Sequence, residues 1–148
     1  MNYKLIPAMQ TDEDWLEDLR RDVYQGLFQA TWGGWDEDRH KRHFAECIAR
    51  GNISIIDVNG MRVGMIQLIN EPDAVEICEI QVEPSHQNQG IGTTVLKDVI
   101  AEAHQLKRNV RLRVGLKNDQ AYRLYERLGF RLVARTETHH HMTCEPLE

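Results

Sequence analysis

The sequence lacks any hydrophobic run that could cross a membrane. No apolar stretch approaches the roughly 20 residues that a membrane-spanning helix needs, which argues against an integral membrane protein. The N-terminal segment reaches the acidic residues Asp12, Glu13 and Asp14 too early for a secretory signal peptide. We therefore expect a cytoplasmic protein that does not act at a membrane.

Cysteine is scarce, and no spacing typical of a metal framework is present. Cys47, Cys78 and Cys144 are far apart and odd in number, which predicts reduced thiols rather than disulfides or zinc ligands. The run His139-His140-His141 could suggest a metal, but strand alternation would place His140 on the face opposite its two neighbours. Because no spaced cysteine or carboxylate completes a site, we expect no metal.

An excess of basic charge is also missing. The chain has 18 Lys and Arg against 23 Asp and Glu, which gives a net charge of -5. Proteins that bind phosphate backbones usually carry a basic excess, so nucleic acid is not expected as the main partner. The 148 residues, 41% of them hydrophobic, contain no repeat, low-complexity tract or linker. This predicts a single domain over residues 1–148.

Hydrophobic periodicity and turn residues predict an α/β protein with a mixed sheet. Helical spacing follows Thr11, a typical capping residue, and strand-like alternation begins at Ile53. Asn59-Gly60 tolerates the positive φ angles of a tight hairpin turn, which predicts an antiparallel pair on either side of it. The expected order is β-α-α-β-β-β-α-β-α-β-β. The expected strands span residues 3–7, 53–58, 62–68, 75–83, 110–116, 130–134 and 139–144, and the expected helices about 11–32, 36–50, 90–106 and 118–128.

The strongest local motif is a glycine-containing segment, residues 83–93, between a strand and a helix. Gly90 and Gly92 let the backbone approach a ligand closely, and the N–H groups of the loop and helix start can then bind a pyrophosphate. No Lys-Ser/Thr follows the glycines, so this is not a Walker A loop, and Val95 stands where a dinucleotide fingerprint needs its third glycine. The alternative is a turn that merely starts a helix.

A second motif lies about 25 residues further on, at residues 118–130. Asn118, Ala121 and Tyr125 would lie along one side of a short helix that ends at Gly129. A phenol at this position could donate a proton to a substrate. The alternative is that Tyr125 only packs, as buried aromatic residues usually do.

Together the two motifs resemble the GNAT superfamily of N-acetyltransferases. The phosphate loop of that superfamily, Arg/Gln-x-x-Gly-x-Gly/Ala, is matched by Gln87-Asn88-Gln89-Gly90-Ile91-Gly92. Its later motif, Asn-x-x-Ala-x-x-Leu-Tyr-x-x-x-Gly-Phe, is matched from Asn118 to Phe130. The close resemblance covers roughly residues 52–135. It implies a GNAT fold, with a mixed sheet splayed between its third and fourth long strands.

The resemblance also implies acetyl-CoA as the acetyl donor. It assigns the pantetheine to the strand backbone, the pyrophosphate to the loop and the thioester end to the short helix. The residues concerned are Ile80, Gln81 and Val82; Gln87, Asn88, Gln89, Gly90, Ile91, Gly92 and Thr93; and Asn118 and Tyr125. In this assignment the amide of Val82 stabilises the oxyanion, and Tyr125 is the general acid that protonates the departing thiolate.

A general base is expected among the acids of the strand before the loop. Family members place such an acid at positions that match Glu76 and Glu79, and Glu79 is preferred because it is nearer the expected thioester. A carboxylate there can accept the proton of an ammonium, directly or through water. The alternative is that these glutamates, with Glu83, simply face solvent.

The sequence defines the acceptor site less sharply than the donor site. Trp32 and Trp35 flank paired glycines and could form a wall for a cationic or apolar acceptor, with Asp36 or Glu37 nearby; otherwise they plug one end of the sheet. His140 is a further candidate for the acceptor cleft. We expect direct transfer to a primary amine of a small molecule rather than a relay through Cys78. A protein N-terminus or lysine, a non-catalytic acyl-CoA-binding module and a homodimer stay open as alternatives.

Overall fold

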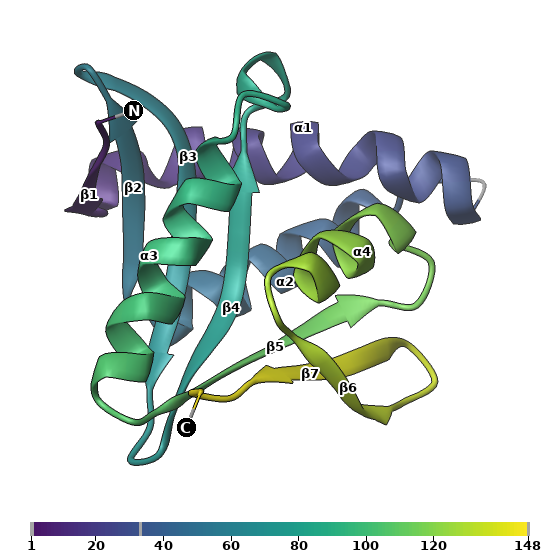
Figure 1. The fold of residues 1–148 in the computed structure, drawn as a ribbon. Helices are drawn as coiled ribbons and strands as arrows, with labels where there is room; N and C mark the ends of the chain where they lie inside the picture. Colours follow the sequence, from purple (N-terminus) through teal and green to yellow (C-terminus); the bar gives the residue numbers. More distant parts are fainter. Residues whose placement is uncertain (1, 33, 148) are drawn as a thin grey trace. The chain divides into compact units, whose positions relative to one another are not determined.

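The structure is a computed structural model that describes residues 2–32 and 34–147 (Figure 1). The chain divides into two compact units. The first comprises Met1–Gln67 and Glu79–Gly92, and the second comprises Leu68–Cys78 and Thr93–Glu148. Seven strands follow the order β1-β2-β3-β4-β5-β7-β6, and both parallel and antiparallel neighbours occur. The predicted element order and the mixed α/β class are therefore confirmed.

The first unit contains two helices and the first strands of the sheet. Its elements are β1 (Lys4–Pro7), a 3-10 turn η1 (Gln10–Asp12), α1 (Glu13–Trp32), α2 (Glu37–Arg50), β2 (Ile53–Val58), most of β3 (Met61–Asn70) and the end of β4 (Ala74–Val82). The turn at Asn59-Gly60 has φ angles of 55° and 83°, and β2 pairs antiparallel with β3, as the sequence predicts. Thr11 is not the helix cap that we expected. The backbone N–H of Met9 donates to the Asp12 carboxylate at 2.8 Å, and this closes the turn before α1 begins.

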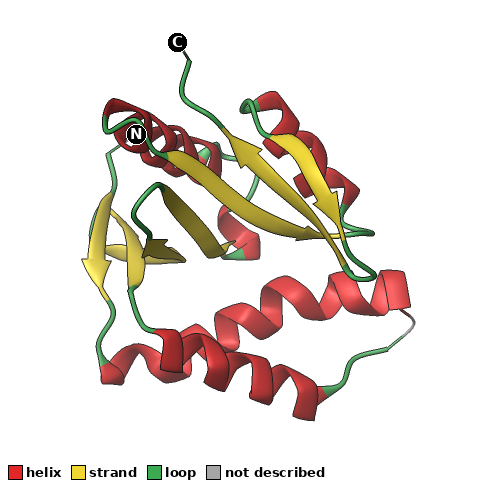
Figure 2. Cartoon of the chain, turned by 90° about the horizontal axis from the view of Figure 1, so that it is seen from below, coloured by secondary structure: helices red, strands yellow, loops and turns green. Residues whose placement is uncertain are grey.

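α1 and α2 run alongside each other (Figure 2) and share a core with β2 and β3. Leu16 and Leu19 of α1 pack with Cys47 of α2 and with strand residues that include Ile55 and Met65. α2 begins where the Asp36 side chain accepts a hydrogen bond from the Arg39 amide at 3.0 Å, and Gly51 follows its end at a φ of 72°. This packing fixes which faces of α1 and α2 remain open for a site.

The second unit contains the remaining elements. They are α3 (Ile91–Gln105), β5 (Asn109–Gly115), α4 (Asp119–Arg127), β6 (Arg131–Arg135) and β7 (His139–Cys144), with the start of β4. β4 pairs in parallel with β5 from Ala74↔Asn109 to Ile77↔Leu112, and β7 lies antiparallel between β5 and β6. Alternate residues of β5 are buried: Val110, Leu112 and Val114.

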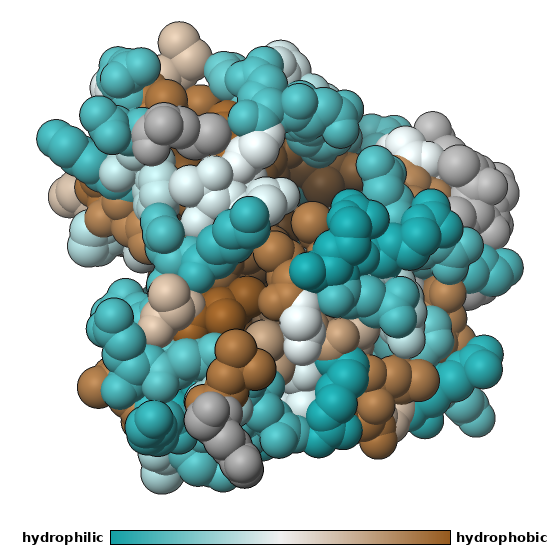
Figure 3. Space-filling view, in the orientation of Figure 1, coloured by the Kyte–Doolittle hydropathy of each residue, from teal (hydrophilic) through white to brown (hydrophobic). Residues whose placement is uncertain are grey.

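Hydrophilic side chains cover much of the face drawn in Figure 3, as expected for a chain with 28% charged residues. Among the described residues, no helix is long and apolar enough to cross a membrane.

Candidate active site

The segment between β4 and α3 forms an exposed loop with an unusual backbone. After the short 3-10 turn η2 (Pro84–His86), Asn88 and Gly90 both have positive φ angles, 63° and 82°, and α3 begins at Ile91. The side chain of Gln87 donates a hydrogen bond to the Val82 carbonyl at 3.0 Å, which ties the loop to the end of β4. Positive φ angles turn successive amides outward, and the start of α3 adds its own N–H groups. This arrangement can bind a phosphate group.

The two motif glycines meet different constraints. At Gly90 a side chain would have open space, but its positive φ is a conformation that L residues rarely adopt. At Gly92 no such φ is present, and a Cβ atom would meet only the Val82 side chain, at 3.8 Å. The backbone conformation therefore favours glycine at position 90, whereas position 92 could hold a side chain without strain in the fold. The absence of a side chain at Gly92 leaves its backbone open to a ligand.

Gly64 of β3 lets two strands approach closely, and it was not among the residues predicted from the sequence. A Cβ atom there would lie 2.3 Å from the Gln81 carbonyl oxygen and 3.2 Å from the Val82 Cα, so no side chain fits. Gly64 thus allows β3 to approach the part of β4 to which we assign the pantetheine contacts. A glycine inside a strand is the sequence signal for such a close approach.

Glu79 is held by two donors. The Tyr24 hydroxyl of α1 donates to Glu79 Oε2 at 3.1 Å, and the Gln81 amide donates to the same oxygen at 3.3 Å. The hydrogen bond from Gln81 shows that Glu79 and Gln81 lie on one face of β4. Glu76 stands opposite Arg111 in the parallel pairing with β5. Tyr24 is absent from the sequence-based candidates because no local pattern links it to a residue 55 positions away.

The motif around α4 folds as a local unit. The Asn118 side chain accepts a hydrogen bond from the Ala121 amide at 3.3 Å, as a helix cap does. Beyond the helix, Gly129 has a φ of 103°, and the Phe130 amide donates to the Tyr125 carbonyl at 3.0 Å. The Tyr125 ring meets the buried ring of Phe130 edge to face, at 5.7 Å between centroids. These contacts fix the orientation of the Tyr125 ring, and Tyr125 is itself only partly buried.

His140 lies in β7, paired with Val114 of β5. Its ring packs edge to face on Tyr122, with the ring centroids 4.8 Å apart, and its buried Nδ1 has no hydrogen-bond partner in the described part of the chain. Within the described part of the chain, no group of three or more His, Cys, Asp or Glu residues could hold a metal ion.

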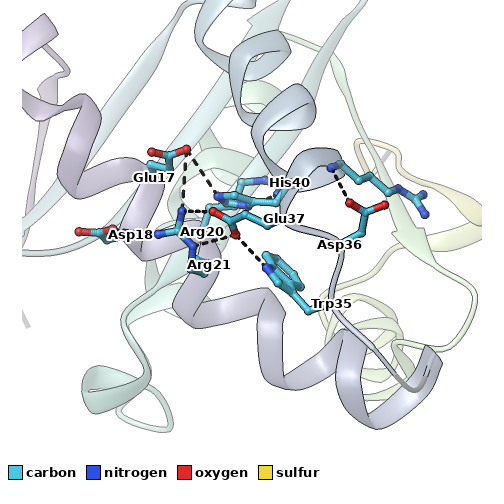
Figure 4. Close-up of polar contacts among 9 residues, drawn as sticks. Glu17, Asp18, Arg20, Arg21, Trp35, Asp36, Glu37 and His40 are labelled. Atoms are coloured by element: carbon cyan, nitrogen blue, oxygen red, sulfur yellow. Dashed lines mark hydrogen bonds and ion pairs between the residues drawn. The ribbon is translucent and has the colours of Figure 1, made fainter.

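Trp35 lies in a pocket on the first unit, beside a network of ion pairs (Figure 4). Its ring N–H donates to Glu37 at 2.9 Å, and Arg21 donates to both oxygens of the same carboxylate, at 2.7 and 3.1 Å. The hydrogen bonds from Arg21 and then from Trp35 lower the pKa of Glu37 to about 2. The negative charge of Glu37 is therefore balanced by Arg21, and the Glu37 carboxylate also holds the Trp35 ring in place. Trp32, the second tryptophan of the predicted acceptor wall, ends α1, and its side chain lies outside the described residues.

The model of the acetyltransferase (GNAT) family matches residues 12–130. This range includes both motifs and the helices and strands that carry them. The chain belongs to the GNAT family. An uncharacterised N-acetyltransferase of Methanocaldococcus jannaschii is 36% identical over 144 residues, covering 86% of this chain. The chain spans 63% of the length of that curated relative.

Solved GNAT structures share the fold at low sequence identity. The PaiA N-acetyltransferase of Thermoplasma acidophilum, in complex with coenzyme A, matches with a TM-score of 0.76 at 14% identity, covering 98% of this chain and 99% of that one. A GNAT family acetyltransferase of Elizabethkingia anophelis with acetyl-CoA bound matches with a TM-score of 0.68 at 20% identity, covering 97% and 98%. These likenesses confirm the predicted GNAT fold.

The candidate residues of this GNAT chain fall into one group on each unit. On the first, Glu79 and Gln81 are in direct contact, and the loop from Gln87 follows them. On the second, Asn118 and Tyr125 lie on α4, and His140 lies on β7. Tyr24 and Gly64 join the first group as residues that only the structure reveals.

Proposed function

We propose that this protein is an acetyl-CoA-dependent N-acetyltransferase that transfers an acetyl group directly to a primary amine. The observation that carries the proposal is the strand–loop–helix segment from Glu79 to Gly92. It combines an anchored carboxylate, a loop with positive φ angles and an open glycine at a helix start. Family membership and relatives solved with coenzyme A or acetyl-CoA bound support the same activity.

The loop fits the donor that the proposal needs. Asn88, Gln89 and Gly90 are exposed, and Gly92, which is partly buried, leaves its own backbone open to a ligand. We assign the pyrophosphate to the residues from Gln87 to Thr93, and the pantetheine to the backbone of Ile80, Gln81 and Val82. When bound, acetyl-CoA supplies an activated thioester. The Val82 amide is our candidate donor to the thioester oxygen as negative charge develops there.

Two side chains move protons in the proposed reaction. An ammonium must lose a proton before its nitrogen can attack a carbonyl, and Glu79 is our first candidate to accept that proton, with Glu76 as the second. Tyr24 and Gln81 hold the Glu79 carboxylate in one orientation, which a general base requires. Tyr125 is our candidate general acid, because a phenol O–H can donate a proton to the departing thiolate.

We assign the acceptor to a small-molecule amine. Trp35 offers an aromatic wall beside a pocket of about 350 Å³, which suits a small molecule better than a protein segment. Trp32 and His140 stay candidates for further acceptor contacts. Residues 1–148 are proposed to act as one acetyltransferase domain.

The test is acetyl-CoA-dependent release of the CoA thiol, measured over a panel of primary amines. We expect turnover with at least one amine, and a marked loss for Glu79→Gln at neutral pH that recovers at high pH, where the free amine needs no base. An equal loss at every pH would assign Glu79 to substrate binding, and a larger effect in Glu76→Gln would assign the base there. Binding of acetyl-CoA without turnover of any amine would instead indicate a non-catalytic acyl-CoA-binding module.

A further inference from the structure

The lining of the Trp35 pocket includes two arginines and two histidines. It lies between α1 and α2 on the first unit, with a volume of about 350 Å³. Its lining residues are Arg20, Phe28, Gly34, Trp35, Asp36, Arg39, His40 and His43. Among the described lining residues, Arg20 and Arg39 carry guanidinium groups, and Asp36 carries the single carboxylate. The Asp36 carboxylate also caps α2 by accepting a hydrogen bond from the Arg39 amide. The charge balance of the lining therefore favours an anionic ligand.

Arg20 is the feature of this pocket that points to a missing partner. Arg20 is only 7% exposed, and its buried Nε has no hydrogen-bond partner among the residues that the structure describes. Its NH1 donates to Nδ1 of His40 at 2.8 Å, which makes that nitrogen the acceptor. Among the described residues, no carboxylate forms an ion pair with Arg20. A buried guanidinium normally pairs with an anion, because desolvating an unpaired charge is costly.

The hydrogen bond from Arg20 to His40 does not compensate the guanidinium charge. Burial, followed by the nearby charges of Arg20 and Arg21, lowers the pKa of this 2% exposed histidine, so its neutral form prevails at neutral pH. Neutral imidazole satisfies one N–H of Arg20 and leaves the guanidinium charge uncompensated. The side chain of Glu37, which could have supplied a negative charge, is bound to Arg21 and Trp35.

The pocket connects to the proposed general base through one aromatic ring. Arg20 stacks on the ring of Tyr24, with its Cζ 5.1 Å from the centroid, and the hydroxyl of the same ring donates to Glu79. A guanidinium thus lies over the face of the Tyr24 ring, and a carboxylate accepts a hydrogen bond from its hydroxyl. Phe28 and Trp35, whose ring centroids are 5.8 Å apart, add an apolar wall.

From this arrangement we propose that the acceptor is an amine that also bears a carboxylate on an apolar or aromatic body. The carboxylate binds Arg20, the body packs on Phe28 and Trp35, and the amine is directed toward Glu79. The inference rests on the proposed function for the role of the amine. The anion site on Arg20 can be tested without any turnover.

The first experiment measures binding of two small probes to the whole protein by calorimetry or ligand-observed NMR. 3-Phenylpropionate carries the carboxylate, and 3-phenylpropionamide is its neutral counterpart. We expect the acid to bind the wild-type protein about ten- to a hundredfold more tightly than the amide, the range for a hydrogen-bonded ion pair. Equal binding of the two probes, or no binding of the acid, would overturn the anion site.

Variants assign the preference to Arg20. Arg20→Gln should remove the difference between the two probes, and Arg20→Lys should keep part of it because the charge remains. Arg42→Gln removes one positive charge from the exposed face of α2, away from the pocket lining, and should leave the preference unchanged. A preference that survives in folded Arg20→Gln, with folding checked by circular dichroism, would contradict the assignment.

The second experiment extends the inference to the acceptor. With acetyl-CoA, the wild-type protein should acetylate phenylalanine at least tenfold more efficiently than phenethylamine or phenylalaninamide, with kcat/KM expressed per concentration of free amine. A preference for phenethylamine would refute the carboxylate-bearing acceptor. Failure of the proposed function would give a different result. No amine would cause release of the CoA thiol from acetyl-CoA, while the binding preference for 3-phenylpropionate would persist.

Discussion

The hydroxyl of Tyr24 donates a hydrogen bond to Glu79 at 3.1 Å, joining α1 to β4 across 55 positions of the sequence. Gln81 donates to the same carboxylate oxygen from the same face of β4. Both donors bond to Oε2 of Glu79, and neither of them bonds to Oε1. In the proposed reaction, this oxygen is our candidate to receive the proton of the amine.

Tyr24→Phe should therefore impair catalysis without removing the base. The substitution keeps the ring under Arg20 but deletes the donor to Glu79, so the carboxylate loses one of its two restraints. We expect kcat/KM to fall by about tenfold, less than for Glu79→Gln, as one hydrogen bond to a charged group suggests. Steady-state assays of both variants test this order. A loss in Tyr24→Phe larger than in Glu79→Gln would show that Tyr24 contacts the substrate itself.

Gly92→Val should abolish acetyl-CoA binding while the protein still folds. In the structure a Cβ at this position meets only the Val82 side chain, at 3.8 Å, so the larger residue mainly obstructs the ligand. The measurement is the increase in melting temperature on addition of acetyl-CoA. Gly64→Ala is the contrasting variant, because its Cβ would lie 2.3 Å from a backbone oxygen, and it should lower the melting temperature without ligand. An unchanged ligand shift in Gly92→Val would place the pyrophosphate elsewhere.

Tyr125→Phe should slow the chemical step and leave the fold intact. Phenylalanine keeps the edge-to-face contact with Phe130 but removes the proton donor. We expect the single-turnover rate to fall by roughly 10²- to 10⁴-fold, with acetyl-CoA affinity nearly unchanged. Single-turnover measurement is needed because product release can hide changes in chemistry. If stability and affinity fall while the rate is preserved, Tyr125 only packs.

The ion pair of Arg21 with Glu37 should stabilise the fold at neutral pH, and this stabilisation should be lost in acid. The pKa of Glu37 is lowered from 4.5 to about 2, first by Arg21, so folding favours the ionised carboxylate. Its contribution is fully present above the unfolded-state pKa of 4.5 and is lost as the pH falls from there toward about 2. Urea unfolding at several pH values should show a shallower loss over this window for Glu37→Gln than for the wild-type protein. Glu102→Gln, exposed on α3, is the matched control and should follow the wild-type curve.

Local sequence signals determined most of the fold. The hairpin at Asn59-Gly60, the cap at Asn118 and the helix end at Gly129 depend on backbone angles and hydrogen bonds within a few residues. Because these features depend on a few neighbouring residues, they can be recognised in a sequence. Where a local signal had a competitor, the prediction was less accurate: Asp12 closes a turn in front of α1, and Thr11 does not cap the helix.

Tertiary structure alone decided which distant side chains meet. Tyr24 reaches Glu79, Arg20 reaches His40, and Gly64 lies against the Gln81 carbonyl because α1, α2 and two strands pack in one particular register. A tyrosine and an arginine on an amphipathic helix look alike in sequence whether they face solvent or a buried partner. Only the packing of the core, which buries Leu16 and Leu19 and so orients α1, determines the direction in which these polar residues point.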